Sequence, residues 1–198
     1  MEESLFPMTI RKTCEWPGKD RLMIRYHDIE WGVPIKDDIK LFEFLVLESA
    51  QAGLSWKTIL HKREGYRKLF VNFDPKKIAR FDERQVQALL QDPSIIRNKL
   101  KINATINTAV KFFEVQKEFG SFSKYMWSFA QHKPIDGKRR SLQDIPAITP
   151  EAELFAKDLK QRGFKFLGPT VVYAHMQAVG MANDHVVTCF RYKEVQQK

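Results

Sequence analysis

Apolar residues recur every three or four positions along most of the chain, whereas the alternation typical of β-strands is scarce. One apolar stripe runs over residues 38–52 and stops at Gly53, and a longer one over residues 99–119 stops at Gly120. Capping residues and glycine or proline signals predict further helices at 55–70, 82–90, 149–163 and 170–179, and a short one that Asp74 and Pro75 open. We therefore expect an all-α protein of roughly eight or more helices.

The chain reads as a single domain over residues 1–198, and this length is sufficient to bury about 70% of the unfolded surface. Residues 131–150, rich in proline, glycine and basic side chains, are the best candidate for a long loop, which could separate two helical lobes. We expect residues 1–10 to form a flexible extension. No apolar run approaches the roughly 20 residues that span a bilayer, so membrane insertion is excluded.

A glutamate interrupts the first apolar stripe. On a helical wheel Glu48 lies among Leu41, Phe44 and Leu45, in the middle of the face that should be buried, whereas Glu43 falls on the other side. A buried carboxylate costs several kcal/mol unless something pairs with it. Glu48 could bond to backbone amides or to an arginine of the protein, or it could await a ligand that brings donors or a positive charge.

Large aromatic residues lie close to this helix in the sequence, at Trp16, Tyr26, Trp31 and Trp56. Such residues are more often core than binding site, yet tryptophan and tyrosine carry polar groups that favour the rim of a cleft. Flat rings are also what a nucleobase stacks on. Between them, Gly53 would allow a close approach of the backbone and Leu54 could insert into a base stack.

The chain carries a net charge of +9, with 33 basic and 24 acidic residues. Each basic cluster taken alone is explained by a solvated face, but the summed excess favours a polyanionic partner. An acid and several aromatic residues in a basic protein together describe a pocket for a base that has been extruded from nucleic acid.

The only two cysteines lie near opposite ends of the chain, each close to a histidine: Cys14 with His27, and His185 with Cys189. The four side chains form a complete ligand set for one tetrahedral zinc ion, which would be structural because no position stays open for water. Buried core residues or a disulfide are the alternatives. The acidic start of the chain does not resemble a secretory signal, so we expect a reducing, cytoplasmic location.

Several segments of this sequence together resemble the DNA-3-methyladenine glycosylase I family of the helix-hairpin-helix DNA glycosylase superfamily. In chain order they are residues 26–34 (YHDIEWGVP), 47–48 (LE), 51–56 (QAGLSW), 96–98 (IRN), 162–166 (RGFKF) and 183–185 (NDH). The resemblance covers nearly the whole chain. It implies a helix-hairpin-helix glycosylase fold whose termini are clasped by one structural zinc ion on the four Cys and His residues. It also implies excision of 3-methyladenine from alkylated double-stranded DNA by a monomer.

The resemblance also assigns roles in base recognition. It implies that Glu48 is the catalytic residue and accepts hydrogen bonds from the amino edge of the base. Tyr26 and Trp56 would sandwich the ring, with Trp16 and Trp31 as outer walls.

For the DNA, the resemblance implies that Gly53 and Leu54 enter the gap left by the base. We place the hairpin around residues 93–104, where Arg97, Asn98 and Lys99 could hold phosphates. This segment lacks the paired glycines usual in superfamily hairpins.

The acidic residue that many relatives place after the hairpin is also missing, because residues 119–135 contain no Asp or Glu. A base methylated at N3 is already cationic and can leave without being protonated. We therefore expect binding of the base and the strained nucleotide to supply most of the acceleration while water attacks the sugar, as in a monofunctional glycosylase. A zinc-stapled DNA-binding module, or a zinc hydrolase with Glu30 or Glu48 as its base, are the alternatives that charge and ligands alone would permit.

Overall fold

The computed structural model describes residues 11–197 and confirms an all-α fold, whereas the predicted extension at residues 1–10 lies outside the described part. Ten α-helices make up the described chain, together with two short 3₁₀ segments and two short strands. In chain order the helices are α1 (Arg21–Ile29), α2 (Asp38–Gln51), α3 (Trp56–Leu69), α4 (Pro75–Ile78), α5 (Glu83–Gln91), α6 (Lys99–Phe119), α7 (Phe122–Ser128), α8 (Pro150–Gln161), α9 (Pro169–Ala178) and α10 (Phe190–Gln196).

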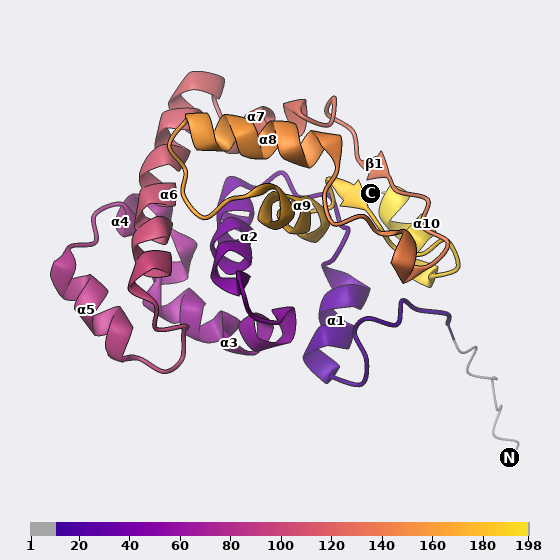
Figure 1. Cartoon of the computed structure of the whole chain (residues 1–198), viewed down its shortest axis with the longest axis horizontal. Coiled ribbons are helices and arrows are strands. Elements are labelled where there is room, and N and C mark those ends of the chain that lie inside the picture. Colours follow the sequence, from indigo (N-terminus) through magenta and orange to yellow (C-terminus); the bar gives the residue numbers. More distant parts are fainter. Residues whose placement is uncertain (1–10, 198) are drawn as a thin grey trace, which may run out of the picture.

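Helix α2 lies at the centre of the molecule, with α6, α3 and α9 around it (Figure 1). It begins after Asp37, whose carboxylate accepts a hydrogen bond from the Lys40 amide at 2.9 Å. Every residue from Leu41 to Ala50 is buried, so α2 is a core helix on all of its faces and not a one-sided amphipathic helix.

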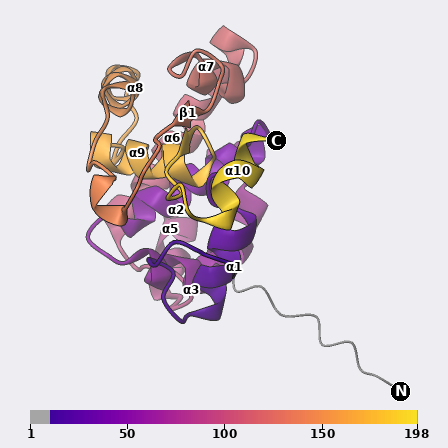
Figure 2. The ribbon, with the colours of Figure 1, turned by 90° about the vertical axis from the view of Figure 1, so that its right-hand side faces the viewer.

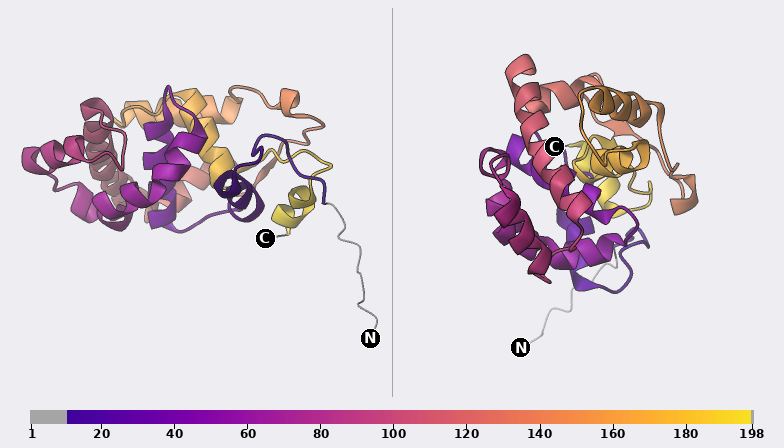
Figure 3. Two further views of the ribbon diagram at one scale, coloured as in Figure 1. Left: turned by 90° about the horizontal axis from the view of Figure 1, so that it is seen from below. Right: turned by 60° about the vertical axis from the view of Figure 1, so that its left-hand side comes forward.

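The first described residues and α10 lie at one end of the elongated molecule, where the Phe190 amide donates a hydrogen bond of 2.9 Å to the Lys12 carbonyl, and α4 and α5 form the other end (Figure 3). In the turned view α10 lies near α1 (Figure 2), and the rings of Phe190 on α10 and His27 on α1 have centroids 6.3 Å apart. Strands β1 (Ile135–Asp136) and β2 (Ala182–Asn183) pair in parallel and tie the long loop to the C-terminal segment. Next to β2, Gly180 has a φ of +69°, and a Cβ there would lie 2.2 Å from the backbone of Val33.

The predicted helices are present and begin at the predicted caps: Ser55, Asp74, Asp82 and Thr149 each bond to an amide of the following turn. The sequence pattern did not predict α1, α7 or α10. These helices have 9, 7 and 7 residues, and helices of that length are formed by tertiary packing more than by local preference.

The predicted long loop is irregular apart from β1 and one 3₁₀ segment at Leu142–Asp144. The other 3₁₀ segment lies at Val71–Phe73. Within residues 11–197, no helix combines the length and apolar character that crossing a bilayer requires.

Candidate functional site

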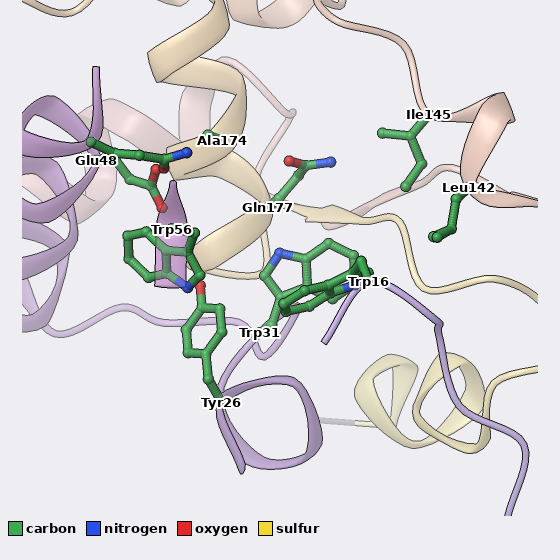
Figure 4. Close-up of a pocket in the computed structure, with 10 residues that line it drawn as sticks. Trp16, Tyr26, Trp31, Glu48, Trp56, Leu142, Ile145, Ala174 and Gln177 are labelled. Atoms are coloured by element: carbon green, nitrogen blue, oxygen red, sulfur yellow. The ribbon is translucent and has the colours of Figure 1, made fainter. Parts of the chain in front are cut away.

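The predicted acid and aromatic residues converge on one cavity of about 440 Å³ (Figure 4). The lining residues that the sequence predicted are Trp16, Tyr26, Trp31, Glu48 and Trp56. Local structure explains this convergence, because Tyr26 lies on α1, Glu48 in the last turns of α2, and Trp56 is the first residue of α3. Trp16 precedes α1 on the chain and Trp31 follows it.

Glu48 is 4% exposed, yet within the described residues its carboxylate accepts no hydrogen bond and meets no cation. Burial therefore raises the pKa of Glu48 from its ordinary value of 4.5 to about 8. The sequence left open whether Glu48 bonds to backbone amides, to an arginine, or to neither. Within the described residues it bonds to neither. Its free polar edge is directed at the cavity (Figure 4).

The helical wheel placed Glu43 on the side opposite the face expected to be buried. This expectation is wrong, because Glu43 is only 1% exposed. Its carboxylate accepts hydrogen bonds from Arg63 and Arg67, both at 2.8 Å. Burial alone would raise the pKa of Glu43, but Arg63 and Lys40 hold it below its ordinary value. Arg63 also bonds to Glu30 at 2.9 Å, so this buried network fastens the end of α1 to α2 and α3.

The rings of Tyr26 and Trp56 contact each other at the cavity, with centroids 5.2 Å apart and planes tilted by 49°. A base sandwiched between two rings needs about 7 Å between them, which is two stacking distances. Burial first, and then the charges of Glu48 and Glu30, raise the pKa of Tyr26, so its hydroxyl keeps its proton and can donate a hydrogen bond.

The turn after α2 borders a second, smaller cavity of about 160 Å³, which Glu48 also lines. Gly53 has a φ of +77°, and Leu54 is 40% exposed. Lys101 fixes this turn, because its ammonium group donates to the carbonyls of Ala50 and Ala52, both at 2.7 Å. A cation there also suits the negative end of the α2 dipole.

The three residues predicted to hold phosphates lie at the start of α6, away from the main cavity. Asn98 caps this helix by accepting from the Lys101 amide at 3.1 Å, and Lys99 pairs with Glu83 at 2.7 Å, while Arg97 is exposed. Because Lys101 contacts the Ala50–Ala52 carbonyls, this helix end stands next to the turn with Gly53 and Leu54.

Besides the predicted hairpin between α5 and α6, helices α8 and α9 with residues 162–168 between them form another candidate hairpin. Unlike the segment at 93–104, its loop carries two glycines, Gly163 and Gly168, and the following residues Thr170 and Val171 line the smaller cavity. Phe166 in this loop is 41% exposed with a φ of +61°. The paired glycines that are missing at 93–104 are therefore found here.

Five lining residues of the main cavity were not predicted: Gln51, Leu142, Ile145, Ala174 and Gln177. Leu142 and Ile145 come from the long loop, which gives no periodic signal in the sequence. Gln177 offered one signal, because it is an amide in the otherwise largely apolar helix α9.

The four predicted metal ligands form one buried cluster, with their ligand atoms all within 4.8 Å of one another. The sulfur of Cys189 lies 3.5 Å from Nε2 of His27 and 3.7 Å from Nδ1 of His185, and Cys14 lies 3.7 Å from the same Nδ1. Sulfur and nitrogen ligands of one tetrahedral metal ion stand ~3.6 Å apart. Both thiols are free, so the alternative of a disulfide is wrong, and the cluster could hold a metal ion that joins the termini.

The remaining ring nitrogens of the cluster are held by neighbours. Nδ1 of His27 lies 2.7 Å from the Asp28 carboxylate, and Nε2 of His185 lies 3.0 Å from the Trp31 carbonyl. These bonds leave one unprotonated nitrogen on each ring for a metal. The rings also pack on the cavity wall, since His185 contacts Trp31 at 4.6 Å between centroids.

Comparisons with known proteins agree with this geometry. A family model described as methyladenine glycosylase matches residues 16–192. DNA-3-methyladenine glycosylase 1 of Escherichia coli (strain K12) is 47% identical over 179 residues, which are 90% of this chain and 96% of that protein. A crystal structure of 3-methyladenine DNA glycosylase I matches with a TM-score of 0.88 at 47% identity, over 90% of this chain and 98% of that one. A variant of 3-methyladenine DNA glycosylase I in complex with 3-methyladenine also has a TM-score of 0.88, at 38% identity and with 90% and 96% covered.

If the cluster holds a metal ion, removal of this ion should loosen both the joined chain segments and the cavity wall that packs on them. A metal that contributes about 4 kcal/mol to stability would, when chelated, lower the Tm by roughly 10 °C. We expect Cys189→Ala to behave like the chelated protein and His132→Asn, a change at an exposed histidine, to behave like wild type. Thermal unfolding together with elemental analysis checks this. Purified protein without metal, whose Tm a chelator leaves unchanged, would contradict the assignment.

Glu48→Gln should stabilise the protein in a pH-dependent way. Because the folded pKa is about 8 and the ordinary value is 4.5, the wild type loses stability relative to the variant as pH rises between these values. The difference in free energy of unfolding should grow by up to about 1.4 kcal/mol per pH unit and level off above pH 8. Urea unfolding from pH 5 to pH 9 measures it.

Glu43→Gln, on the same helix, is the matched control for this experiment. It should destabilise the protein throughout the range, because it breaks the contacts to Arg63 and Arg67. If the difference in free energy of unfolding between wild type and Glu48→Gln does not change with pH, the carboxylate of Glu48 is paired or solvated in the folded protein.

Proposed function

This chain belongs to the methyladenine glycosylase family and is a glycosylase enzyme, and we propose that it excises 3-methyladenine from alkylated double-stranded DNA. The observation that carries the proposal is the uncompensated Glu48 carboxyl group on the wall of an aromatic cavity. An aromatic cavity with one unpaired acid fits a flat ligand that has both donors and a positive charge.

Glu48 recognises the extruded base. Adenine methylated at N3 is cationic in DNA, and its exocyclic amine donates hydrogen bonds. Entry of this cation favours the ionised form of Glu48, so the energy that burial costs the carboxylate is recovered when the lesion binds. A neutral adenine lacks the charge and gains less.

The aromatic side chains hold the ring of the base. Tyr26 and Trp56 now touch, so a sandwich between them requires the two rings to separate, and Trp16 and Trp31 form the outer wall. A cation over the faces of these rings is favourable, and most so for tryptophan. Stacking therefore selects the methylated base for its charge as well as its shape.

The reaction needs little acid catalysis. The C1′–N9 bond breaks, its electron pair neutralises the cationic purine, and water adds to C1′ of the sugar and loses a proton. Binding of the strained nucleotide supplies most of the acceleration. No amine of the protein attacks the sugar in this scheme, so the enzyme is monofunctional and leaves an intact strand with an abasic site.

DNA contacts surround the smaller cavity. The turn with Gly53 and Leu54 enters the gap that the base leaves, and Lys101 keeps this turn in place. Arg97, Asn98 and Lys99 on one side bind phosphates, and the α8–α9 hairpin with its two glycines flanks the other side. One chain carries the whole arrangement, so we propose that it acts as a monomer.

Zinc is the metal that two thiolates and two imidazoles favour. Cys14, His27, His185 and Cys189 would hold it, and it would supply structural closure of the termini. With all four positions taken by protein ligands, a zinc hydrolase is disfavoured, and Glu30 is already engaged by Arg63. Membership of an enzyme family disfavours a DNA-binding module without catalysis.

The test is release of free 3-methyladenine from methylated duplex DNA, measured by chromatography. Glu48→Gln should reduce kcat/KM by about 10- to 100-fold, the worth of a charged hydrogen bond. Wild-type kcat/KM should rise with pH up to about 8, as Glu48 ionises, whereas the variant profile should be flat there.

Glu64→Gln is the control, because this acid is 82% exposed on α3 and lies outside the cavity. It should excise the base like wild type. Undiminished excision by Glu48→Gln would refute the role of Glu48, and absence of any released base from wild type would refute the activity. Strand cleavage without alkali would refute the monofunctional scheme.

A further inference from the structure

Gln177 places an oriented amide on the wall of the main cavity. Its Nε2 donates a hydrogen bond of 2.7 Å to the carboxylate of Asp184. Within the described residues its side-chain oxygen Oε1 accepts no hydrogen bond, and this oxygen lies on the side that faces Glu48 (Figure 4). The cavity therefore presents two acceptors, one charged on α2 and one neutral on α9.

Asp184 prevents the amide from turning over. This residue is 1% exposed, and its oxygens also accept from Arg139 at 2.7 Å and from the hydroxyl of Tyr173. With three donors around it, the carboxylate acts only as an acceptor. A flipped Gln177 would set its carbonyl against this carboxylate and lose a buried hydrogen bond, so the NH₂ group stays away from the cavity.

A fixed acceptor distinguishes the two purines at position 6. Adenine carries an amino group there, which donates two hydrogen bonds, whereas guanine carries an oxygen that only accepts. A freely rotating glutamine could donate to the guanine oxygen, but one locked by Asp184 cannot. Charge does not separate these lesions, since guanine methylated at N3 is cationic as well.

Building on the proposed function, we propose that Gln177, held by Asp184, is a specificity-determining residue that selects 3-methyladenine over 3-methylguanine. Glu48 accepts one hydrogen of the amine and the carbonyl of Gln177 accepts the other. Sites that hydrogen-bond a substrate group discriminate strongly against analogues that lack it, because buried polar atoms are then left unpaired.

The experiment measures both bases in one digestion. Duplex DNA treated with a methylating agent contains both lesions, and mass spectrometry gives their initial rates of release. For Gln177→Met we expect 3-methyladenine release to fall about tenfold, while 3-methylguanine release stays or rises. Because both products come from one sample, partial unfolding of the variant cancels in the ratio.

Gln51→Met is the matched control, since Gln51 lines the same cavity but, among residues 11–197, no hydrogen bond fixes its side-chain amide. Its two rates should change together and leave the ratio within about twofold of wild type. An unchanged ratio in Gln177→Met, or an equal shift of the ratio in Gln51→Met, would overturn the inference. Wild type that releases neither base would instead overturn the proposed function.

Discussion

The structure depends on the surroundings of two buried glutamates, Glu43 and Glu48, on the central helix α2. On α2, Glu43 is surrounded by Arg63, Arg67 and Lys40, whereas Glu48 meets no donor and no cation within the described residues. The first network fastens α1, α2 and α3, and the second site leaves an unmet need for a positive charge. The same helix thus carries one buried acid that is fully paired and one that is not. An unpaired buried acid with a shifted pKa is typical of a binding site.

The Cys and His cluster packs directly against the wall of the cavity. Cys14 and His27 are close in sequence to Trp16 and Tyr26, and His185 packs on Trp31. A metal ion held by this cluster would therefore also fix the aromatic wall of the cavity. The cluster residues near the two ends of the chain therefore support the wall of the cavity as well as each other.

Local patterns allowed much of the fold to be predicted, because helix caps and apolar stripes are encoded within a few residues. The burial of Glu48 followed from its neighbours on one helix, the metal ligands from the spacing of each cysteine and histidine, and the aromatic residues from their closeness to this helix in the sequence, while the family resemblance assigned their roles. The burial of Glu43 could not be predicted, since it depends on Arg63 from another helix. Gln177 and Leu142 reach the cavity through tertiary contacts, which no sequence period records.

The protonation state of Glu48 tests the central claim most directly. Infrared difference spectra of wild type against Glu48→Gln would isolate the carboxyl band of this residue from pH 4 to pH 10. The account predicts that the band of the protonated acid persists to a midpoint near pH 8 in the free enzyme. A midpoint near the ordinary value of 4.5 would contradict it, because Glu48 would then be solvated or paired.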